Sequence, residues 1–157
     1  MELSRAEKCH LAELMGWFPD ARSALNWGGP GLTFPFEPKR FMEEIHFERM
    51  DGFVWVERRR LAGFAQTYLK YERCHLARIA LAPDRRGQGH GRPFIRMVAE
   101  AGCAAYGAAE CSLYVLDDNL PALRCYRSLG FAPAYDPKPP TEVPNCLFLV
   151  ASREALR

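Results

Sequence analysis

Length, composition and charge first limit the classes of protein that this chain can represent. The chain has 157 residues, 48% of them hydrophobic, which is the usual size of one domain with a substantial core. Its 21 Lys and Arg residues against 19 Asp and Glu residues leave a formal net charge of +2. Nucleic-acid-binding domains of this size normally carry a larger basic excess gathered on one face, so no nucleic-acid partner is expected.

The N-terminal third predicts short helices and a loop. Ser4 and Glu7 have the spacing of a capping box, ahead of apolar residues that recur at helical intervals, namely Leu11, Leu14 and Met15. Gly16 and Pro19 should end this helix, and residues 21–27 can form a second one. The glycines and prolines of residues 28–38 resist regular structure and predict a loop, after which residues 39–47 can return to helix.

Residues 53–81 change in character and predict a meander of three strands. Its apolar runs cover residues 53–57, 61–69 and 74–81. Arg58, Arg59 and Arg60 form the only tight basic run and lie between the first two strands. A solvated hairpin turn explains this position better than a phosphate-binding patch does.

The second half of the chain predicts helices alternating with strands. A helix over residues 92–106 precedes a strand over 111–116, and a helix capped by Asn119 runs to residue 129. Gly107 and Gly130 stand where helix C-caps belong, and strands follow from residue 131 and over 146–151. Together, the predicted helices and strands indicate one domain of mixed α/β (α+β) class, with a mixed sheet covered by helices and without internal repeats.

The six cysteines show no spacing typical of a metal or redox motif. Cys9-His10 and Cys74-His75 are adjacent pairs, and adjacent side chains point apart on strands and on helices, so such pairs seldom ligate one ion. We therefore expect buried free thiols and no metal. The N-terminus has no apolar signal region and no long apolar run occurs, so a cytoplasmic protein without membrane contact is expected.

The strongest single feature is the glycine-rich string Arg86-Gly87-Gln88-Gly89-His90-Gly91 between a predicted strand and a predicted helix. A helix N-terminus leaves N–H groups unpaired and attracts phosphate, and glycines let the backbone approach a diphosphate closely. Arg85, Arg86 and Arg92 add positive charge nearby. A P-loop lysine and the third glycine of a dinucleotide motif are both missing. An ordinary strand-to-helix turn remains open on these residues alone.

Two motifs in order resemble those of the GNAT N-acetyltransferases. Arg86-x-x-Gly89-x-Gly91 resembles motif A, and Asn119-x-x-Ala122-x-x-Cys125-Tyr126-x-x-x-Gly130-Phe131 resembles the family's second signature. The resemblance covers residues 53–135 well. It implies a mixed, mostly antiparallel central sheet flanked by helices, in which the strands ending at Leu81 and Leu116 are parallel and splay apart. It also implies a single domain with an acceptor-site region (1–50), an acetyl-CoA-binding core (53–135) and a C-terminal loop and strand (136–157).

The resemblance further implies acetyl-CoA as co-substrate and direct acetyl transfer to a primary amine of a small molecule, a protein N-terminus or a lysine. The pantetheine arm would lie along the strand that ends at Leu81, and a nearby N–H would stabilise the oxyanion. Tyr126 holds the position of the acid that protonates the leaving thiolate, because a phenol with a reference pKa of about 10 is protonated at neutral pH. The implied cofactor-binding residues are Ile79, Leu81, Arg86, Gly87, Gln88, Gly89, His90, Gly91, Arg92, Asn119, Ala122 and Tyr126.

The general base is less well defined. Counting back along motif A, where family members often have Glu, this chain has His75, which can accept a proton. A merely structural histidine, the rivals Asp117 and Asp118, and a water chain all remain open. Aromatic residues of the N-terminal third could form an acceptor-pocket wall or pack into a minor core, namely Trp27, Phe34 and Phe36.

A second class of function is a non-catalytic acyl-CoA-binding sensor or interaction module. Such a binder need not keep a proton donor, so Tyr126 favours catalysis. The expected partner is an amine acceptor substrate, and a homodimer is left open.

Overall fold

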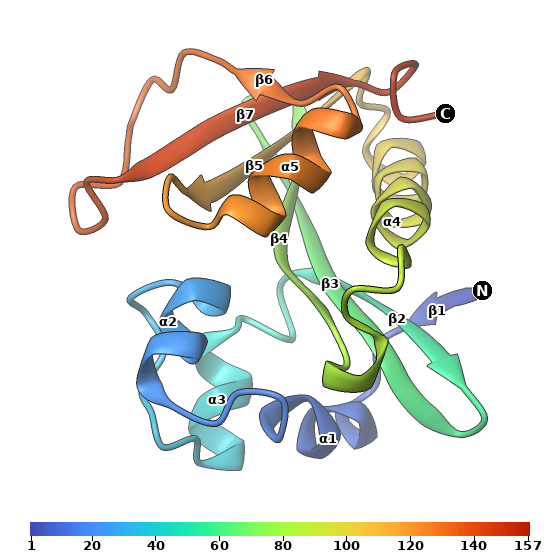
Figure 1. The fold of residues 1–157 in the computed structure, drawn as a ribbon, viewed down its shortest axis with the longest axis vertical. Coiled ribbons are helices and arrows are strands. Elements are labelled where there is room, and N and C mark those ends of the chain that lie inside the picture. The colour runs from blue at the N-terminus through green and yellow to red at the C-terminus, as the bar shows by residue number, and fades with distance from the viewer. The chain divides into compact units, whose positions relative to one another are not determined.

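The computed structural model describes all residues from Met1 to Arg157 and divides them into two compact units. Unit 1 comprises residues 1–66 and 78–90, and unit 2 comprises residues 67–77 and 91–157. Two long strands pass through both units (Figure 1). Each unit is described by itself below.

The strands form one mixed sheet in the order β1-β2-β3-β4-β5-β7-β6. They are β1 (Leu3–Arg5), β2 (Asp51–Glu57), β3 (Arg60–Lys70), β4 (Arg73–Leu81), β5 (Glu110–Leu116), β6 (Ala132–Pro133) and β7 (Cys146–Ser152). β4 and β5 pair in parallel, whereas β1 with β2, β5 with β7 and β6 with β7 pair antiparallel. The expectation of a mixed, mostly antiparallel sheet flanked by helices is confirmed.

The beginning of the chain corrects one sequence prediction. Ser4 does not cap a helix but lies in β1, opposite Val54 of β2. The capping box is at Glu7 and His10 instead, around a 3-10 turn (η1, Lys8–His10) that leads into α1 (Leu11–Met15). The spacing of Ser4 and Glu7 is typical of a helix start. A local spacing carries no information on a strand partner 50 residues away, so it could not reveal the pairing with Val54. Gly16 ends α1 as expected.

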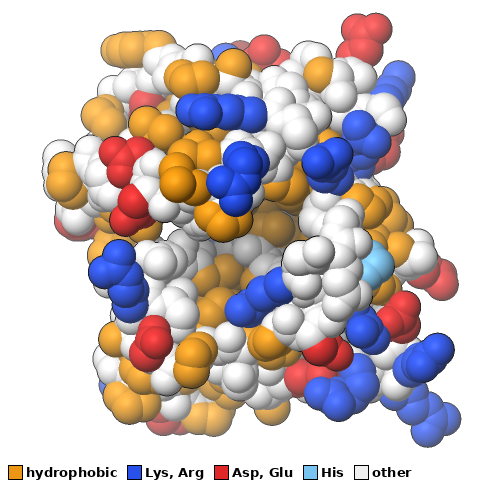
Figure 2. Space-filling view, in the orientation of Figure 1, with side chains coloured by type: hydrophobic (Ala, Val, Ile, Leu, Met, Phe, Trp, Pro, Cys, Tyr) orange, Lys and Arg blue, Asp and Glu red, His pale blue; other side chains and the backbone are white.

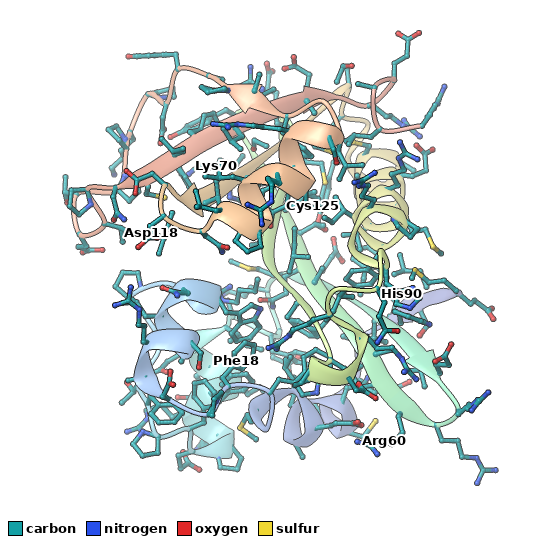
Figure 3. All side chains as sticks on the ribbon, viewed as in Figure 1. Phe18, Arg60, Lys70, His90, Asp118 and Cys125 are labelled. Carbon is teal, nitrogen blue, oxygen red and sulfur yellow. The ribbon has the colours of Figure 1, made fainter.

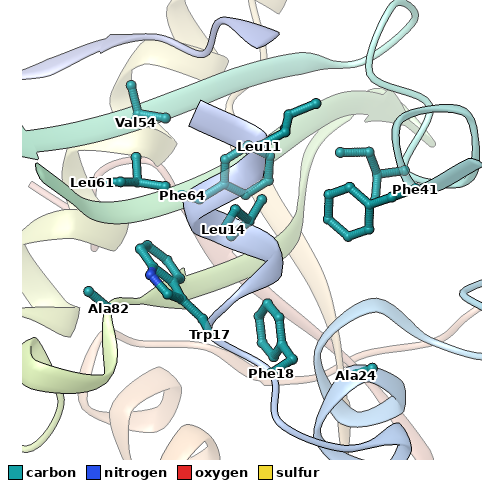
Figure 4. Packing of buried hydrophobic residues seen from close by; sticks show 11 residues of the cluster. Leu11, Leu14, Trp17, Phe18, Ala24, Phe41, Val54, Leu61, Phe64 and Ala82 are labelled. Carbon is teal, nitrogen blue, oxygen red and sulfur yellow. The ribbon is translucent and has the colours of Figure 1, made fainter. Parts of the chain in front are cut away.

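Unit 1 combines this short helix with α2 (Ala21–Gly28), α3 (Pro38–Glu44) and the strands β1 and β2 (Figure 1). Asp20 caps α2 through the backbone N–H of Ser23, and Glu37 caps α3 through two backbone N–H groups. The helices pack apolar side chains with those of β2 and β3 into one cluster (Figure 4). Phe41, Ile45 and Phe64 are essentially fully buried in it, so this unit has a dense core of its own.

The arginine run forms the hairpin turn that the sequence predicts. Arg58 and Arg59 lie between β2 and β3 with φ values of 50° and 63°. Left-handed values at both central residues are those of the two-residue turns whose twist matches a hairpin. Arg60 then donates to Glu13 of α1 at 2.7 Å, so this basic run serves the fold of unit 1.

Unit 2 is built on α4 (Gly91–Tyr106), α5 (Leu120–Ser128) and the strands β5, β6 and β7. The apolar side of α4 is buried, including Phe94, Ile95 and Val98, and α4 contacts both β5 and α5. Gly107 and Gly130 follow the two helices with φ values of 64° and 91°, as the sequence predicts for C-caps. β5 and β7 pair along seven residues, which fixes the facing side chains of this unit.

None of the helices combines the length and the apolar composition that a transmembrane segment needs. Basic and acidic side chains are interspersed on the face that Figure 2 shows. This distribution agrees with the near-neutral formal charge of the chain.

Candidate cofactor and catalytic site

The glycine-rich segment forms a tight turn after β4. A 3-10 turn (η2, Pro83–Arg85) follows the strand, and the chain then reaches the first residue of α4 at Gly91. The N–H of Ala82 donates to the carbonyl oxygen of Ala62 in β3 at 2.9 Å. The amide of Gln88 donates to the carbonyl oxygen of Asp84 at 2.6 Å. These bonds hold the two sides of the turn in place.

Gly87 and Gly89 have the backbone conformation that requires glycine. Their φ values are 72° and 82°, and a Cβ built at either position would meet nothing within 4 Å. No N–H from Gly87 to His90 donates a backbone hydrogen bond, and the first N–H groups of α4 lack intrahelical acceptors by helix geometry. The turn therefore presents free donors on an open backbone, which is the chemistry that a diphosphate needs.

Two of the arginines next to this turn are occupied by the protein itself. Arg85 forms an ion pair with Glu57 at 2.6 Å. Arg86 donates through Nε to the carbonyl oxygen of Leu81 at 3.0 Å and through Nη2 to that of Trp17 at 3.5 Å, and its burial lowers its pKa. Arg86 thus stabilises the turn, and the exposed Arg92 is the arginine at the start of α4 that remains open to an anion.

His90 ends the unit 1 part of the turn and contacts an aromatic ring. Its imidazole lies 5.1 Å from the ring of Trp55 on β2, edge to face, and Figure 3 shows it just before α4. This contact anchors the last residue of the turn to the meander.

β4 is not a regular strand throughout its length. Arg78 has a φ of 48°, which is unusual for a residue with a side chain. Its guanidinium lies 3.0 Å from Oε1 of Gln66 and 3.4 Å from the carbonyl oxygen of Ile45. The regular alternation of side chains along a strand is therefore interrupted at Arg78, and Ile79 and Leu81 lie half-buried beyond it, in unit 1.

In unit 2, Asn119 caps α5 as predicted. Its side-chain oxygen accepts from the N–H of Ala122 at 3.4 Å, and Pro121 is accommodated in the first turn of the helix. Capping alone accounts for the presence of Asn119, and the cap fixes the position of Ala122.

Tyr126 lies in the last turn of α5. Its ring meets Phe131 edge to face at 5.8 Å, and its carbonyl oxygen accepts from the N–H of Phe131 at 3.1 Å. Burial and, to a smaller extent, the neighbouring Cys125 (labelled in Figure 3) raise the pKa of the Tyr126 phenol. The hydroxyl is therefore protonated at neutral pH, as a proton donor must be.

His75 lies in the interior of unit 2. It is 2% exposed, its Nδ1 lies 2.8 Å from Oγ of Ser112 on β5, and its ring packs among aromatic residues, namely Tyr68, Tyr114 and Phe148. Burial and, to a smaller extent, the Lys70 ammonium lower the pKa of His75 to about 3. A neutral imidazole at physiological pH can accept a proton, but such a low pKa makes it a weak base.

The two carboxylate rivals differ in their surroundings. Asp117 accepts from the amide of Asn145 at 3.2 Å, whereas Asp118 is exposed at the loop before α5 (Figure 3). A third carboxylate, Asp136, was not predicted from the sequence and accepts from the hydroxyls of Tyr114 at 2.7 Å and Tyr71 at 3.3 Å. Only the fold brings these three residues together, so no spacing in the chain could reveal them.

The aromatic residues proposed for an acceptor wall pack against the core cluster of unit 1. Trp27 stacks on Phe18 at 4.4 Å, Phe34 meets Phe36 at 5.3 Å, and Phe36 meets Phe41 at 4.8 Å. These contacts agree with the packing alternative that the sequence left open. Nε1 of Trp27 is buried without a hydrogen-bond partner.

The predicted site residues fall in both units. Unit 1 holds Ile79, Leu81, Arg86, Gly87, Gln88, Gly89 and His90, and unit 2 holds His75, Gly91, Arg92, Asn119, Ala122 and Tyr126.

The sequence matches the acetyltransferase (GNAT) family over residues 17–131. This match covers well over half of the chain, so the chain belongs to the acetyltransferase (GNAT) family.

Two curated relatives and one solved structure illustrate the likeness. The chain is 32% identical over 99 residues to the ribosomal protein bS18-alanine N-acetyltransferase of Escherichia coli (strain K12), covering 63% of this chain and 66% of that protein, slightly under two thirds of its length. It is 39% identical over 74 residues to streptothricin acetyltransferase of Streptomyces lavendulae, covering 46% and 39%. Its fold matches spermidine N-acetyltransferase from Vibrio cholerae, in complex with CoA and spermine, with a TM-score of 0.75, 15% identity and coverage of 99% and 96%.

Proposed function

We propose that this protein transfers an acetyl group from acetyl-CoA directly to a primary amine. The observation that carries this proposal is the turn from Gly87 to Gly91, where positive-φ glycines and unbonded N–H groups lead into a helix N-terminus. That arrangement suits a diphosphate, and the family and its CoA-bound fold relative support CoA as the molecule that carries it.

The residues divide the work of binding. Backbone N–H groups from Gly87 to Arg92 hold the diphosphate, and the Arg92 side chain adds charge at the open start of α4. Arg86 contributes indirectly, because its bonds to the Leu81 and Trp17 carbonyl oxygens keep the turn in its open conformation. Ile79 and Leu81 offer backbone groups to the pantetheine arm. Ala122 of α5 and Asn119, the N-cap of that helix, are the other proposed contacts with the cofactor.

Tyr126 is the proposed acid. Attack of the amine on the thioester expels a thiolate, which needs a proton from a group that is protonated before the step. The phenol of Tyr126 meets this condition because its pKa is raised, and a phenolate forms only transiently. The backbone supplies the oxyanion contact, and the amine attacks the thioester directly, without a covalent acyl-enzyme.

The proton on the incoming ammonium has a less well supported acceptor. His75 is neutral, but it is buried among aromatic rings and its pKa of about 3 leaves little driving force for taking a proton. We therefore propose that water carries this proton, and we keep His75 as the alternative base. An intact turnover in the variant His75→Gln would support the water route.

The acceptor is proposed only as a class. The relatives named above act on a ribosomal protein alanine, on streptothricin and on spermidine, which share an amine and little else. Residues 1–50 are the proposed acceptor side. The free state of all six cysteines supports a cytoplasmic location, since a reducing compartment preserves thiols.

One assay separates this enzyme from a non-catalytic acyl-CoA binder. The purified chain is incubated with acetyl-CoA and a panel of polyamines, aminoglycoside-like compounds and peptides with free N-termini, and thiol release is followed. Turnover with any amine supports the transferase. Tight binding of acetyl-CoA by calorimetry, with no release across the panel, supports the sensor instead.

A further inference from the structure

Three cysteines that are far apart in the sequence meet in the interior of unit 2. Cys74 lies on β4, Cys103 on α4 and Cys111 on β5, and their three Sγ atoms all lie within 4.8 Å of one another. All three are free and 0% exposed. We call them the three-thiol cluster. The three cysteines form no metal motif in the sequence because each comes from a different element.

The fold brings the three thiols together through two local features. The parallel register of β4 and β5 pairs Cys74 directly with Cys111. On α4, Gly102 lies beside Cys103, and a Cβ at Gly102 would lie within 2.4 Å of the Cys74 sulfur. The missing side chain therefore allows the helix to approach β4, which places the Cys103 sulfur 3.3 Å from that of Cys111.

The cluster contains sulfur ligands only. Thiolates prefer soft ions, and structural zinc normally takes four ligands, one more than the cluster offers. A monovalent or divalent ion bound by three thiolates would leave net negative charge in the interior, which is costly. A trivalent metalloid bound by three thiolates is neutral, so charge balance selects this class of ligand.

We propose that the three-thiol cluster binds one trivalent arsenic atom, supplied as arsenous acid, through three As–S bonds. Three S–H bonds and three As–O bonds break, three As–S bonds form, and each hydroxyl leaves as water with one thiol hydrogen. No electron is gained or lost, and no charge is buried. The reaction starts from neutral thiols, the form that an apolar interior favours.

Native mass spectrometry of the reduced full-length protein, after incubation with sodium arsenite and removal of excess, tests this site. The expected product is heavier by one arsenic atom less three hydrogens, since an adduct with only two As–S bonds would retain a hydroxyl. The paired variant Cys9→Ser/Cys146→Ser, which changes two cysteines outside the cluster, should give the same product.

Removal of one cluster thiol should abolish the three-bond product. Cys103→Ala is the first variant because alanine suits a helix, and Cys111→Ala replaces it if circular dichroism shows that Cys103→Ala does not fold. An unmodified wild-type mass, an adduct that retains a hydroxyl, a three-bond adduct in the alanine variant, or its loss in Cys9→Ser/Cys146→Ser would each overturn the assignment.

Discussion

Nδ1 of His75 lies 2.8 Å from Oγ of Ser112, across the parallel pair of β4 and β5. Both residues are buried, so this contact satisfies two polar groups in the interior of unit 2. The residue that the sequence offers as a catalytic base thus has a structural role that explains its presence.

This burial predicts a dependence of stability on pH. His75 has a folded pKa of about 3, below the unfolded value of 6.5, so the unfolded chain binds the proton more readily. The contribution is fully present above about pH 6.5 and is lost as the pH falls toward 3. Between pH 7 and pH 5 the free energy of unfolding should fall by about 2 kcal/mol through this group. Urea titrations of wild type and His75→Gln at both pH values measure it, and an equal fall in the variant would exclude His75 as the cause.

Tyr126→Phe should lower turnover while leaving acetyl-CoA affinity nearly unchanged. Loss of a general acid typically costs about 100-fold or more in rate, whereas the phenyl ring keeps the contact with Phe131. Steady-state kinetics and calorimetry measure the two effects. Tyr135→Phe, at a residue 83% exposed, is the matched control and should behave as wild type. An unaltered rate in Tyr126→Phe would remove it as the acid.

Gly89→Val should weaken acetyl-CoA binding by about tenfold or more, because a β-branched residue resists a φ of 82° and its side chain covers the open backbone. Gly107→Val is the control, since Gly107 has a φ of 64° at the other end of α4. The control should lose stability but, once folded, bind normally by calorimetry. Equal dissociation constants for Gly89→Val and wild type would contradict the diphosphate assignment.

Asn119 can be tested for its two roles separately. Asn119→Ala should cost about 1 kcal/mol of stability through loss of the cap on α5, whereas Asn119→Asp keeps an oxygen that accepts from the N–H of Ala122. Thermal unfolding reports the cap, and the dissociation constant of acetyl-CoA reports the cofactor contact. Weaker binding in the stable Asn119→Asp variant would show that Asn119 also meets the cofactor, and unchanged binding would leave it a cap alone.

Much of the fold follows from local sequence. Gly87, Gly89, Gly107 and Gly130 all adopt positive φ where the pattern places turns and caps, and Asn119 caps the helix that it precedes. Strand and helix positions from residue 51 onward agree with the expected ranges to within a few residues. Backbone preference and apolar periodicity act over a few neighbouring residues, so the chain itself encodes them.

Only the tertiary structure decided which distant residues meet. Ser4 pairs with Val54 instead of capping a helix, Arg86 donates to backbone carbonyl oxygens, and His75 is buried beside Ser112. The meeting of Cys74, Cys103 and Cys111 belongs to the same class. Burial, pKa and contact depend on elements that are remote along the chain, and no local pattern specifies those, because each arises from strand register and helix packing in the folded state.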